Sequence, residues 1–192
     1  MKEIVVNVTN QYNVLAGPGL LAQSGNLIKK RDNRIQKLMI VSDSNVAPLY
    51  MSKLRGSLEA SGFEVFEYVF EAGEQSKNLN TIGEILVALA AAAFTRTDAL
   101  LALGGGVATD MAGFAASIFL RGIKVFQLPT SLLAQVDASV GGKTGVDLPQ
   151  GKNLVGAFWQ PALVLADTAL LSSLSDQVFT EGMAEVIKYA FI

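Results

Sequence analysis

Short apolar runs alternate along the chain with longer segments in which apolar residues recur every three or four positions. The short runs are rich in β-branched residues and predict strands at residues 3–8, 37–43, 64–70, 99–105, 124–129 and 162–167. The longer segments predict helices at residues 46–61, 78–94, 107–120 and, more briefly, 131–140. Three of the strands are almost wholly apolar, as strands covered on both faces must be. The alternation predicts an α/β fold, a Rossmann-like and mostly parallel sheet flanked by helices.

Three residues mark the expected ends of these helices. Asn45 and Asn78 stand where an N-cap is needed, and Gly62 stands where a helix would end. The strand pattern disappears after residue 167, and a helical pattern begins near Asp176, which we take as a further N-cap. We therefore expect an α/β domain over residues 1–172 and the start of a helical unit over residues 173–192.

The last twelve residues, EGMAEVIKYAFI, form one helix in this interpretation. Glu181, Glu185 and Lys188 would then lie on one side, because residues three and four apart are neighbours on a helix. Ala184, Ile187 and Phe191 would form an apolar stripe. Two acids and a lysine on one face could be half of a metal or substrate site.

Composition narrows the function classes. The chain has 192 residues, 51% of them apolar and 17% charged, and a net charge of −2, which gives no electrostatic reason to expect a nucleic-acid or membrane partner. It contains no cysteine and no histidine, so disulfides, thiolate metal sites and thiol nucleophiles are excluded. The N-terminus lacks the apolar core of a signal peptide, and the most apolar run, residues 84–94, is too short to cross a bilayer. A cytosolic protein is the default expectation.

The sharpest local feature is the stretch LALGGGVATDMAGF, in which a buried strand runs through three glycines directly into a helix. Such a turn lets backbone N–H groups approach a ligand, and the helix N-terminus behind it favours anions such as a pyrophosphate. The order is not G-x-G-x-x-G, and a tight turn without a ligand is the alternative. Asp110, which we place in the first turn of this helix, would be within reach of a ribose or nicotinamide group.

Polar residues also follow other predicted strands. Residues 127–161 form a glycine-rich stretch that we interpret as a functional loop, although a solvated loop with incidental charges is the alternative. It carries Thr130, Ser131, Asp137, Lys143, Asp147, Lys152 and Asn153. Asp43, Glu74 and Lys77 follow two further strands, where they could also be capping or surface residues. The carboxyl ends of parallel strands meet at one edge, so we expect these groups to surround one crevice.

Four segments together resemble the 3-dehydroquinate synthase family. They are GGGVATDMAGF, RGIKVFQLPTSLLAQVDASVGGKTGVD, GKNLVGAFWQP and EGMAEVIKYA, and the resemblance extends from about Asp43 to the end. Members of this family have an N-terminal NAD-binding α/β domain and a C-terminal helical domain that holds most metal and substrate contacts, and they are usually homodimers. The family converts 3-deoxy-D-arabino-heptulosonate 7-phosphate into 3-dehydroquinate and phosphate, with NAD reduced and reoxidised in each cycle.

The resemblance implies roles for individual residues. NAD would contact Asp43, Glu74, Lys77, Gly105, Gly106, Asp110, Thr130, Ser131, Lys143, Lys152, Asn153 and Ser173. Asp137, Lys143 and Lys188 would face the sugar-phosphate substrate, and Arg121 would reach its phosphate, from the partner subunit of a dimer. Glu185 matches the glutamate that binds a divalent metal, zinc or cobalt. Thr130-Ser131 replaces the paired threonines of many members, and Ser173 replaces a frequent threonine; both changes keep the hydroxyl group.

One departure concerns the metal. The family completes its metal site with two histidines from the C-terminal domain, and this sequence has none. A catalytic zinc normally takes three protein ligands, so Glu185 cannot hold it alone. We therefore expect the chain to be the cofactor-binding half of a longer enzyme, ending on the first helix of the missing domain, folded but inactive alone.

Three alternatives stay open. A metal-dependent NAD alcohol or glycerol dehydrogenase would also use the glycine turn, but it would accumulate NADH during turnover. A non-catalytic module would bind NAD without turnover. Another sugar-phosphate cyclase would differ only in its substrate.

Overall fold

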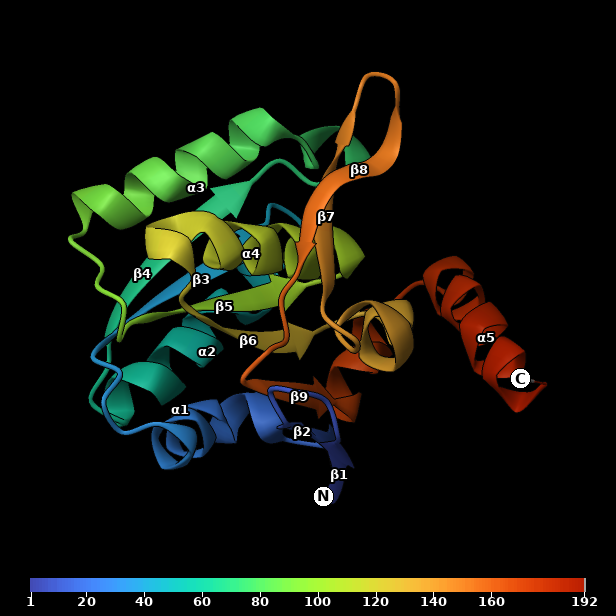
Figure 1. Ribbon diagram of the computed structural model, residues 1–192. Helices are drawn as coiled ribbons and strands as arrows, with labels where there is room; N and C mark the ends of the chain where they lie inside the picture. Colours follow the sequence, from blue (N-terminus) through green and yellow to red (C-terminus); the bar gives the residue numbers. More distant parts are fainter. Residues whose placement is uncertain (192) are drawn as a thin grey trace.

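The computed structural model describes residues 1–191 and contains a seven-stranded sheet with helices on both faces (Figure 1). The strands of this sheet are β1 (Lys2–Val6), β2 (Tyr12–Gly17), β3 (Lys37–Asp43), β4 (Glu64–Phe70), β5 (Ala99–Gly104), β6 (Lys124–Pro129) and β9 (Leu163–Asp167). The helices are α1 (Leu20–Arg31), α2 (Ala47–Ala60), α3 (Leu79–Ala91), α4 (Gly106–Ile118) and α5 (Asp176–Ala190). Two further strands, β7 (Lys143–Leu148) and β8 (Gly151–Phe158), form a separate hairpin.

The strand order is β1-β2-β9-β6-β5-β3-β4, and every neighbouring pair except β1 with β2 is parallel. The predicted α/β class and the mostly parallel sheet are therefore confirmed. Strand β5 lies between β3 and β6, and all six of its residues are buried. This burial explains why the run ALLALG is wholly apolar, since both of its faces are covered.

Each face of the sheet packs against its own pair of helices. Helices α1 and α2 cover one face, with Ile28 and Leu54 among their fully buried side chains. Helices α3 and α4 cover the other, where Ile85 and Met111 are fully buried. The two pairs lie on opposite sides of the strands in Figure 1. Burial of these faces fixes the positions of the loops at the carboxyl ends of the strands.

Helix α1 and strand β2 were not predicted. The backbone N–H groups of Gly19 and Leu21 donate to the Asp167 carboxylate at 2.9 and 2.8 Å, so the cap of α1 comes from the end of β9. A cap supplied almost 150 positions away leaves no local signal in the sequence. Strand β2 pairs with β9 as well as with β1, so its place also depends on a distant segment.

The hairpin β7–β8 is the largest departure from the predicted elements. We expected a loop here because of its glycines, but residues 143–148 and 151–158 pair antiparallel, with Gly145 opposite Gly156. The hairpin rises beside α4 and projects from the domain in Figure 1. Val146 is fully buried in the same core cluster as α3 and α4. Residues 143–158 are therefore a β-hairpin that packs against α4 instead of a loop.

The predicted helix ends were partly correct. The Asn78 side chain accepts from Thr81 N at 3.0 Å, so it is the N-cap of α3. Gly62, with φ of 84°, follows α2 in the left-handed region, as the expected helix stop requires. Asn45 is not an N-cap, because α2 begins two residues later and Asn45 N donates to Asp43. Asp176 is the first residue of α5, and Ser175 is its cap.

Two shorter elements also differ from expectation. The segment 131–140 holds a one-turn π-helix, η3 (Ala134–Ala138), instead of a longer helix. Helix α4 begins at Gly106 and continues into a 3₁₀ turn, η2 (Phe119–Arg121). None of the helices among residues 1–191 has the length and apolar character needed to span a membrane.

Candidate functional site

The predicted groups lie at one edge of the sheet. From β3 the chain moves outward to β4 and then returns to β5 on the other side of β3, so the direction of winding reverses between β3 and β5. Ligands of open α/β sheets bind outside the carboxyl ends of the strands at such a reversal. Asp43 ends β3, and Gly104 ends β5 beside it. A Cβ atom built on Gly104 would lie 3.3 Å from Asp43 Oδ2, so the two strand ends are in contact.

Neither the backbone conformation nor the packing requires glycine at positions 105 and 106 of the turn. Gly105 has φ of −78°, and Gly106 is not among the residues with positive φ. A Cβ atom at these positions would meet its nearest neighbours at 3.6 and 3.5 Å, which are ordinary contacts. Gly104 differs, because its Cβ would lie 2.7 Å from the Cβ of Ala108. The fold therefore explains Gly104 but does not require glycine at positions 105 and 106.

Helix α4 starts at this turn, and its first N–H groups point toward the open side because they have no partner one turn earlier. Thr130 N donates to Gly104 O at 2.9 Å, which ties the end of β6 to the turn. Ser131 Oγ accepts from Ala134 N at 3.3 Å. The two residues thus line the turn on the β6 side, as predicted.

Lys77, Asp110 and Asn153 form a connected cluster beside the turn. Lys77 Nζ lies 2.7 Å from Asp110 Oδ2 and 2.6 Å from Asn153 Oδ1. Burial raises the pKa of the Asp110 carboxyl, and the hydrogen bond from Lys77 opposes that rise. Asp110 lies in the second turn of α4, because the helix starts at Gly106; its predicted first-turn position was wrong.

A second, exposed ion pair joins Lys152 to Glu74 at 3.1 Å. The Lys152 side chain is 72% exposed and that of Glu74 is 44% exposed. Such a pair contributes about 0–1 kcal/mol, so Lys152 can exchange this partner for an anion at little cost.

A cleft of about 950 Å³ is lined by Asp110 of α4, by η3 and the residues after it, by the hairpin β7–β8 and by Tyr189 of α5. Four predicted residues, Asp110, Asp137, Lys143 and Asn153, and the unpredicted Tyr189 give it polar walls. Its apolar lining includes Val136, Leu154 and Phe158. Apolar walls with a few convergent polar groups are typical of cofactor and small-molecule sites.

Helix α5 contributes Tyr189 to the cleft lining and carries Glu185 and Lys188 beside it. Glu185 forms an ion pair with Lys188, and one of its carboxylate oxygens is buried. Tyr189 Oη donates to Asp137 Oδ1 at 2.6 Å. The predicted apolar stripe, Ala184, Ile187 and Phe191, is exposed, and the face toward the domain carries Gly182 instead. Glu181 accepts a hydrogen bond from Gln177 Nε2 at 3.2 Å on the surface.

The other predicted residues do not line this cleft, and two of them, Arg121 and Ser173, also lie outside the cluster beside the glycine turn. Arg121 lies at the carboxyl end of α4, about 20 Å along the helix from the glycine turn at 1.5 Å per residue. Ser173 ends the 3₁₀ turn η4 (Thr168–Ser173), is exposed, and donates to Leu170 O at 2.9 Å.

The residues described do not by themselves form a metal site. Within residues 1–191 no group of three or more histidine, cysteine, aspartate or glutamate side chains could hold an ion. Glu185 is the one predicted ligand, and a catalytic zinc takes about three protein ligands.

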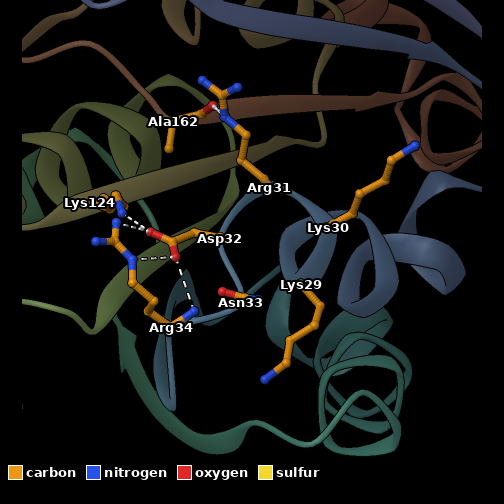
Figure 2. Close-up of a pocket in the computed structure, with 8 residues that line it drawn as sticks. All are labelled: Lys29, Lys30, Arg31, Asp32, Asn33, Arg34, Lys124 and Ala162. Carbon is orange, nitrogen blue, oxygen red and sulfur yellow. Dashed lines mark hydrogen bonds and ion pairs between the residues drawn. The ribbon is translucent and has the colours of Figure 1, made fainter.

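A second hollow, of about 590 Å³, lies at the opposite edge of the sheet and is lined by Lys29, Lys30, Arg31, Asp32, Asn33, Arg34, Lys124 and Ala162. Arg34 and Lys124 both pair with Asp32, while Lys29 and Lys30 point away from it (Figure 2). Arg31 donates to the carbonyls of Ala162 and Gln11 at 3.0 Å each. These contacts hold the end of α1 against β6 and the residue before β9, so the hollow has a structural role.

Two residues near the cleft were given no individual role by the sequence. Asp147 Oδ1 accepts from Asn153 N at 2.7 Å, which holds the left-handed turn of Asn153. Asp147 had been noted only as one charge of the polar stretch. Tyr189 was not singled out, although it lies four positions after Glu185 and so near it on the helix.

Comparison with known proteins agrees with this geometry. Residues 67–181 match the family described as the N-terminal part of 3-dehydroquinate synthase. The chain belongs to the 3-dehydroquinate synthase family. The 3-dehydroquinate synthase of Symbiobacterium thermophilum is 49% identical over 182 residues, which are 95% of this chain and 51% of that protein. The chain thus spans about half the length of the curated relatives it matches.

Solved structures of the superfamily share the fold. A 2-deoxy-scyllo-inosose synthase complexed with carbaglucose-6-phosphate, NAD⁺ and Co²⁺ superposes with a TM-score of 0.90 at 30% identity, covering 97% of this chain and 50% of that one. The 2-epi-5-epi-valiolone synthase from Streptomyces hygroscopicus, with NAD⁺ and Zn²⁺ bound, gives 0.83 at 32% identity, covering 98% and 51%.

Proposed function

We propose that the complete protein is a 3-dehydroquinate synthase, a carbon–oxygen lyase of the shikimate pathway that makes precursors of the aromatic amino acids. It would convert 3-deoxy-D-arabino-heptulosonate 7-phosphate into 3-dehydroquinate and phosphate. This chain would supply the cofactor-binding half. The observation that carries the proposal is the pair Gly105 and Gly106, whose lack of side chains serves no need of the fold.

NAD fits this edge of the sheet. The open backbone at Gly105 and Gly106, with the first N–H groups of α4 behind it, suits a pyrophosphate. Asp43 uses Oδ1 to accept from Asn45 N and Val46 N, while Oδ2 faces Gly104. That second oxygen is placed to accept from a ribose hydroxyl. When bound, NAD supplies the hydride acceptor for a substrate alcohol.

The surrounding polar side chains would position one another and bind the phosphates of the cofactor. Lys77 orients Asp110 and Asn153 at the cleft wall, and Lys152 can move from Glu74 to a phosphate. Thr130 and Ser131 complete the turn, and Ser173 stands at the end of η4 on the same edge.

The substrate would occupy the outer part of the cleft. Lys143 lines it and is exposed, so its ammonium is free to meet the carboxylate or hydroxyls of a sugar acid. Asp137 lines it from η3, and Lys188 lies beside Tyr189, the residue of α5 that lines it. Arg121 is too far along α4 to join them in the same subunit, which agrees with a role toward the phosphate bound by a partner subunit.

We also propose that the complete protein takes a divalent metal, zinc or cobalt, with Glu185 as the ligand from this chain. The match of Glu185 to the metal-binding glutamate of the family supports this assignment, and in the structure its buried Oε2 forms an ion pair with Lys188. The described residues do not complete this metal site by themselves. We propose further that residues 1–172 are the NAD-binding domain, that residues 173–192 begin a helical domain, and that the complete protein is a cytosolic homodimer.

A second candidate is another sugar-phosphate cyclase, favoured by the likeness to a synthase bound to carbaglucose-6-phosphate. A dehydrogenase is the third. The products separate these candidates, since a dehydrogenase accumulates NADH and the cyclases do not.

The test is phosphate release with product identification by mass. The heptulosonate phosphate, NAD and zinc or cobalt are supplied to this chain and to the complete gene product. Dehydroquinate from the complete product only, without net NADH, is the expected result. Turnover of another sugar phosphate in preference would reassign the protein among the cyclases, and NADH accumulation would make it a dehydrogenase.

A further inference from the structure

The hydrogen bond from Tyr189 to Asp137 connects α5 to the α/β domain. Tyr189 Oη donates to Asp137 Oδ1 at 2.6 Å, and both residues line the same cleft. Asp137 lies on η3, between β6 and the hairpin, whereas Tyr189 lies in the last turn of α5. One hydroxyl therefore bridges two elements that are 52 positions apart.

The bond fixes one oxygen of Asp137 and leaves the other free. Among residues 1–191, the Tyr189 hydroxyl is the side-chain group that donates a hydrogen bond to the Asp137 carboxylate. Without it the side chain could rotate about its bonds at the cleft edge. With it, Oδ2 is held in one direction, ready to accept from a ligand hydroxyl or to orient a lysine.

Gly182 provides a second anchor on the same face of α5. It precedes Tyr189 by seven positions, which is two helical turns. A Cβ at Gly182 would lie 2.7 Å from Leu132 Cβ and 2.8 Å from Leu133 N, so the helix sits directly on that segment. Only a residue without a side chain allows this approach.

Glu185 and Lys188 lie between Gly182 and Tyr189 along α5. Lys188 pairs with Glu185, and its Nζ also lies 4.9 Å from the centre of the Tyr189 ring. The ring therefore contacts Lys188 through a cation–π interaction while its hydroxyl holds Asp137. The position of one side chain thus affects both charged groups proposed to meet the substrate.

We propose that Tyr189 is a positioning residue of the synthase: its hydroxyl orients Asp137 and, together with Gly182, fixes α5 against the domain with Glu185 and Lys188 beside the cleft. The inference rests on the proposed function. It assigns Tyr189 no chemical step.

The experiment compares Tyr189→Phe with Tyr68→Phe in the complete gene product. Tyr68 is a matched control, because its hydroxyl donates to Glu84 at 2.5 Å on the surface between β4 and α3, away from the cleft. Loss of a hydrogen bond to a charged group predicts a fall of about tenfold in kcat/KM for the heptulosonate phosphate. NAD affinity stays within about twofold, because the contact lies outside the glycine turn. Equal effects of the two substitutions would overturn the proposal.

A double-mutant cycle tests whether Tyr189 acts through Asp137. Tyr189→Phe added to Asp137→Asn is expected to cost little beyond Asp137→Asn alone, because coupled residues are not additive. Fully additive losses would overturn the assignment.

Hydrogen exchange gives a readout that does not depend on the reaction. Faster exchange of the amides at 182–189 in Tyr189→Phe, and not in Tyr68→Phe, is the expected result, and unchanged exchange would overturn the seating role. If the parent protein makes no dehydroquinate, the proposed function fails while this exchange test of the α5 seat still stands.

Discussion

Lys77 Nζ lies 2.7 Å from Asp110 Oδ2, and the two side chains are 6% and 19% exposed. The same ammonium donates to Asn153 Oδ1 at 2.6 Å, so one charge joins the turn before α3, helix α4 and the hairpin β7–β8. Asp147 adds to this junction by donating its N–H to Lys77 O at 2.9 Å. The junction holds Asp110 and Asn153 together at the cleft wall.

Replacing Lys77 with methionine is expected to destabilise the protein at pH 7 by about 2–3 kcal/mol, because Asp110 would keep a buried charge without its partner. Urea unfolding measures the change. Lys152→Met is the control, since its exposed pair with Glu74 should contribute at most about 1 kcal/mol. Equal losses in the two variants would contradict a special role for the buried pair.

The Lys77→Met deficit should depend on pH. Burial raises the folded-state pKa of Asp110 above its unfolded value, and removal of Lys77 takes away the contact that opposes this rise. Between the two pKa values the folded state binds more protons than the unfolded state, so the contribution of this group to stability falls as pH rises. The deficit should therefore be smaller at acidic pH than at pH 7. A deficit that stays constant as the pH is lowered would rule this account out.

Gly105→Ala tests whether glycine at this position is needed for stability or for binding NAD. Its Cβ would meet Ser131 Oγ at 3.6 Å and the backbone φ is −78°, so the free energy of unfolding should change by less than about 1 kcal/mol. NAD affinity should fall at least tenfold, since the methyl group would stand where the pyrophosphate approaches. Thermal unfolding and NAD titration give the two readouts. Unchanged NAD affinity would show that the glycine turn does not hold the cofactor.

Gly113→Ala tests the packing of the hairpin on α4. A Cβ at Gly113 would overlap Cγ2 of Thr144 on β7, and overpacking typically costs about 1–3 kcal/mol. Thr144→Ser removes that methyl group and keeps the hydroxyl that donates to Ala157 O at 2.7 Å. The double substitution should recover most of the loss.

Gly83→Ala is the control for this pair. Gly83 lies inside α3 with nothing within 4 Å of a Cβ atom, so alanine should stabilise the helix by up to about 1 kcal/mol. If Thr144→Ser gave no recovery in Gly113→Ala, the close approach of α4 and β7 would not be the cause of its loss.

Local patterns were enough to predict the central sheet. Strands β3, β4, β5 and β6 have apolar or β-branched runs bounded by turn residues, and their predicted limits agree with the structure to within a residue. Because parallel strands end at one edge, the positions of Asp43, Glu74, Lys77 and the glycine turn followed from their order in the chain. That part of the candidate site needed no knowledge of tertiary contacts.

Elements that depend on distant partners could not be predicted in this way. Helix α1 takes its cap from Asp167, and β8 exists because its glycines allow it to lie close to β7. The exposed stripe of α5 illustrates the same limit, since helical spacing identifies an apolar face without saying which face meets the domain. The close approach at Gly182, which decides that face, is visible only in the packed structure.

The ion pairs of Asp32 with Arg34 and Lys124 give a prediction away from the cleft. Hydrogen bonds from Arg34 are the main cause that holds the pKa of the Asp32 carboxyl well below its usual range, and Lys124 adds to the effect (Figure 2). Asp32→Asn should therefore destabilise the protein at pH 7 by about 1–2 kcal/mol, because both cations lose a charged acceptor. Glu64→Gln, on an exposed side chain at the start of β4, should have little effect.

The pH dependence of this loss has the opposite sign to that of the Lys77 variant. A carboxyl with a lowered folded-state pKa stabilises the protein above its unfolded pKa of about 3.9, and that contribution is lost as pH falls further. The gap between the parent protein and Asp32→Asn should therefore close below about pH 4. Thermal unfolding of both proteins between neutral and acidic pH measures the gap. A gap that persisted unchanged into acid would mean that the Asp32 charge does not hold α1 against β6.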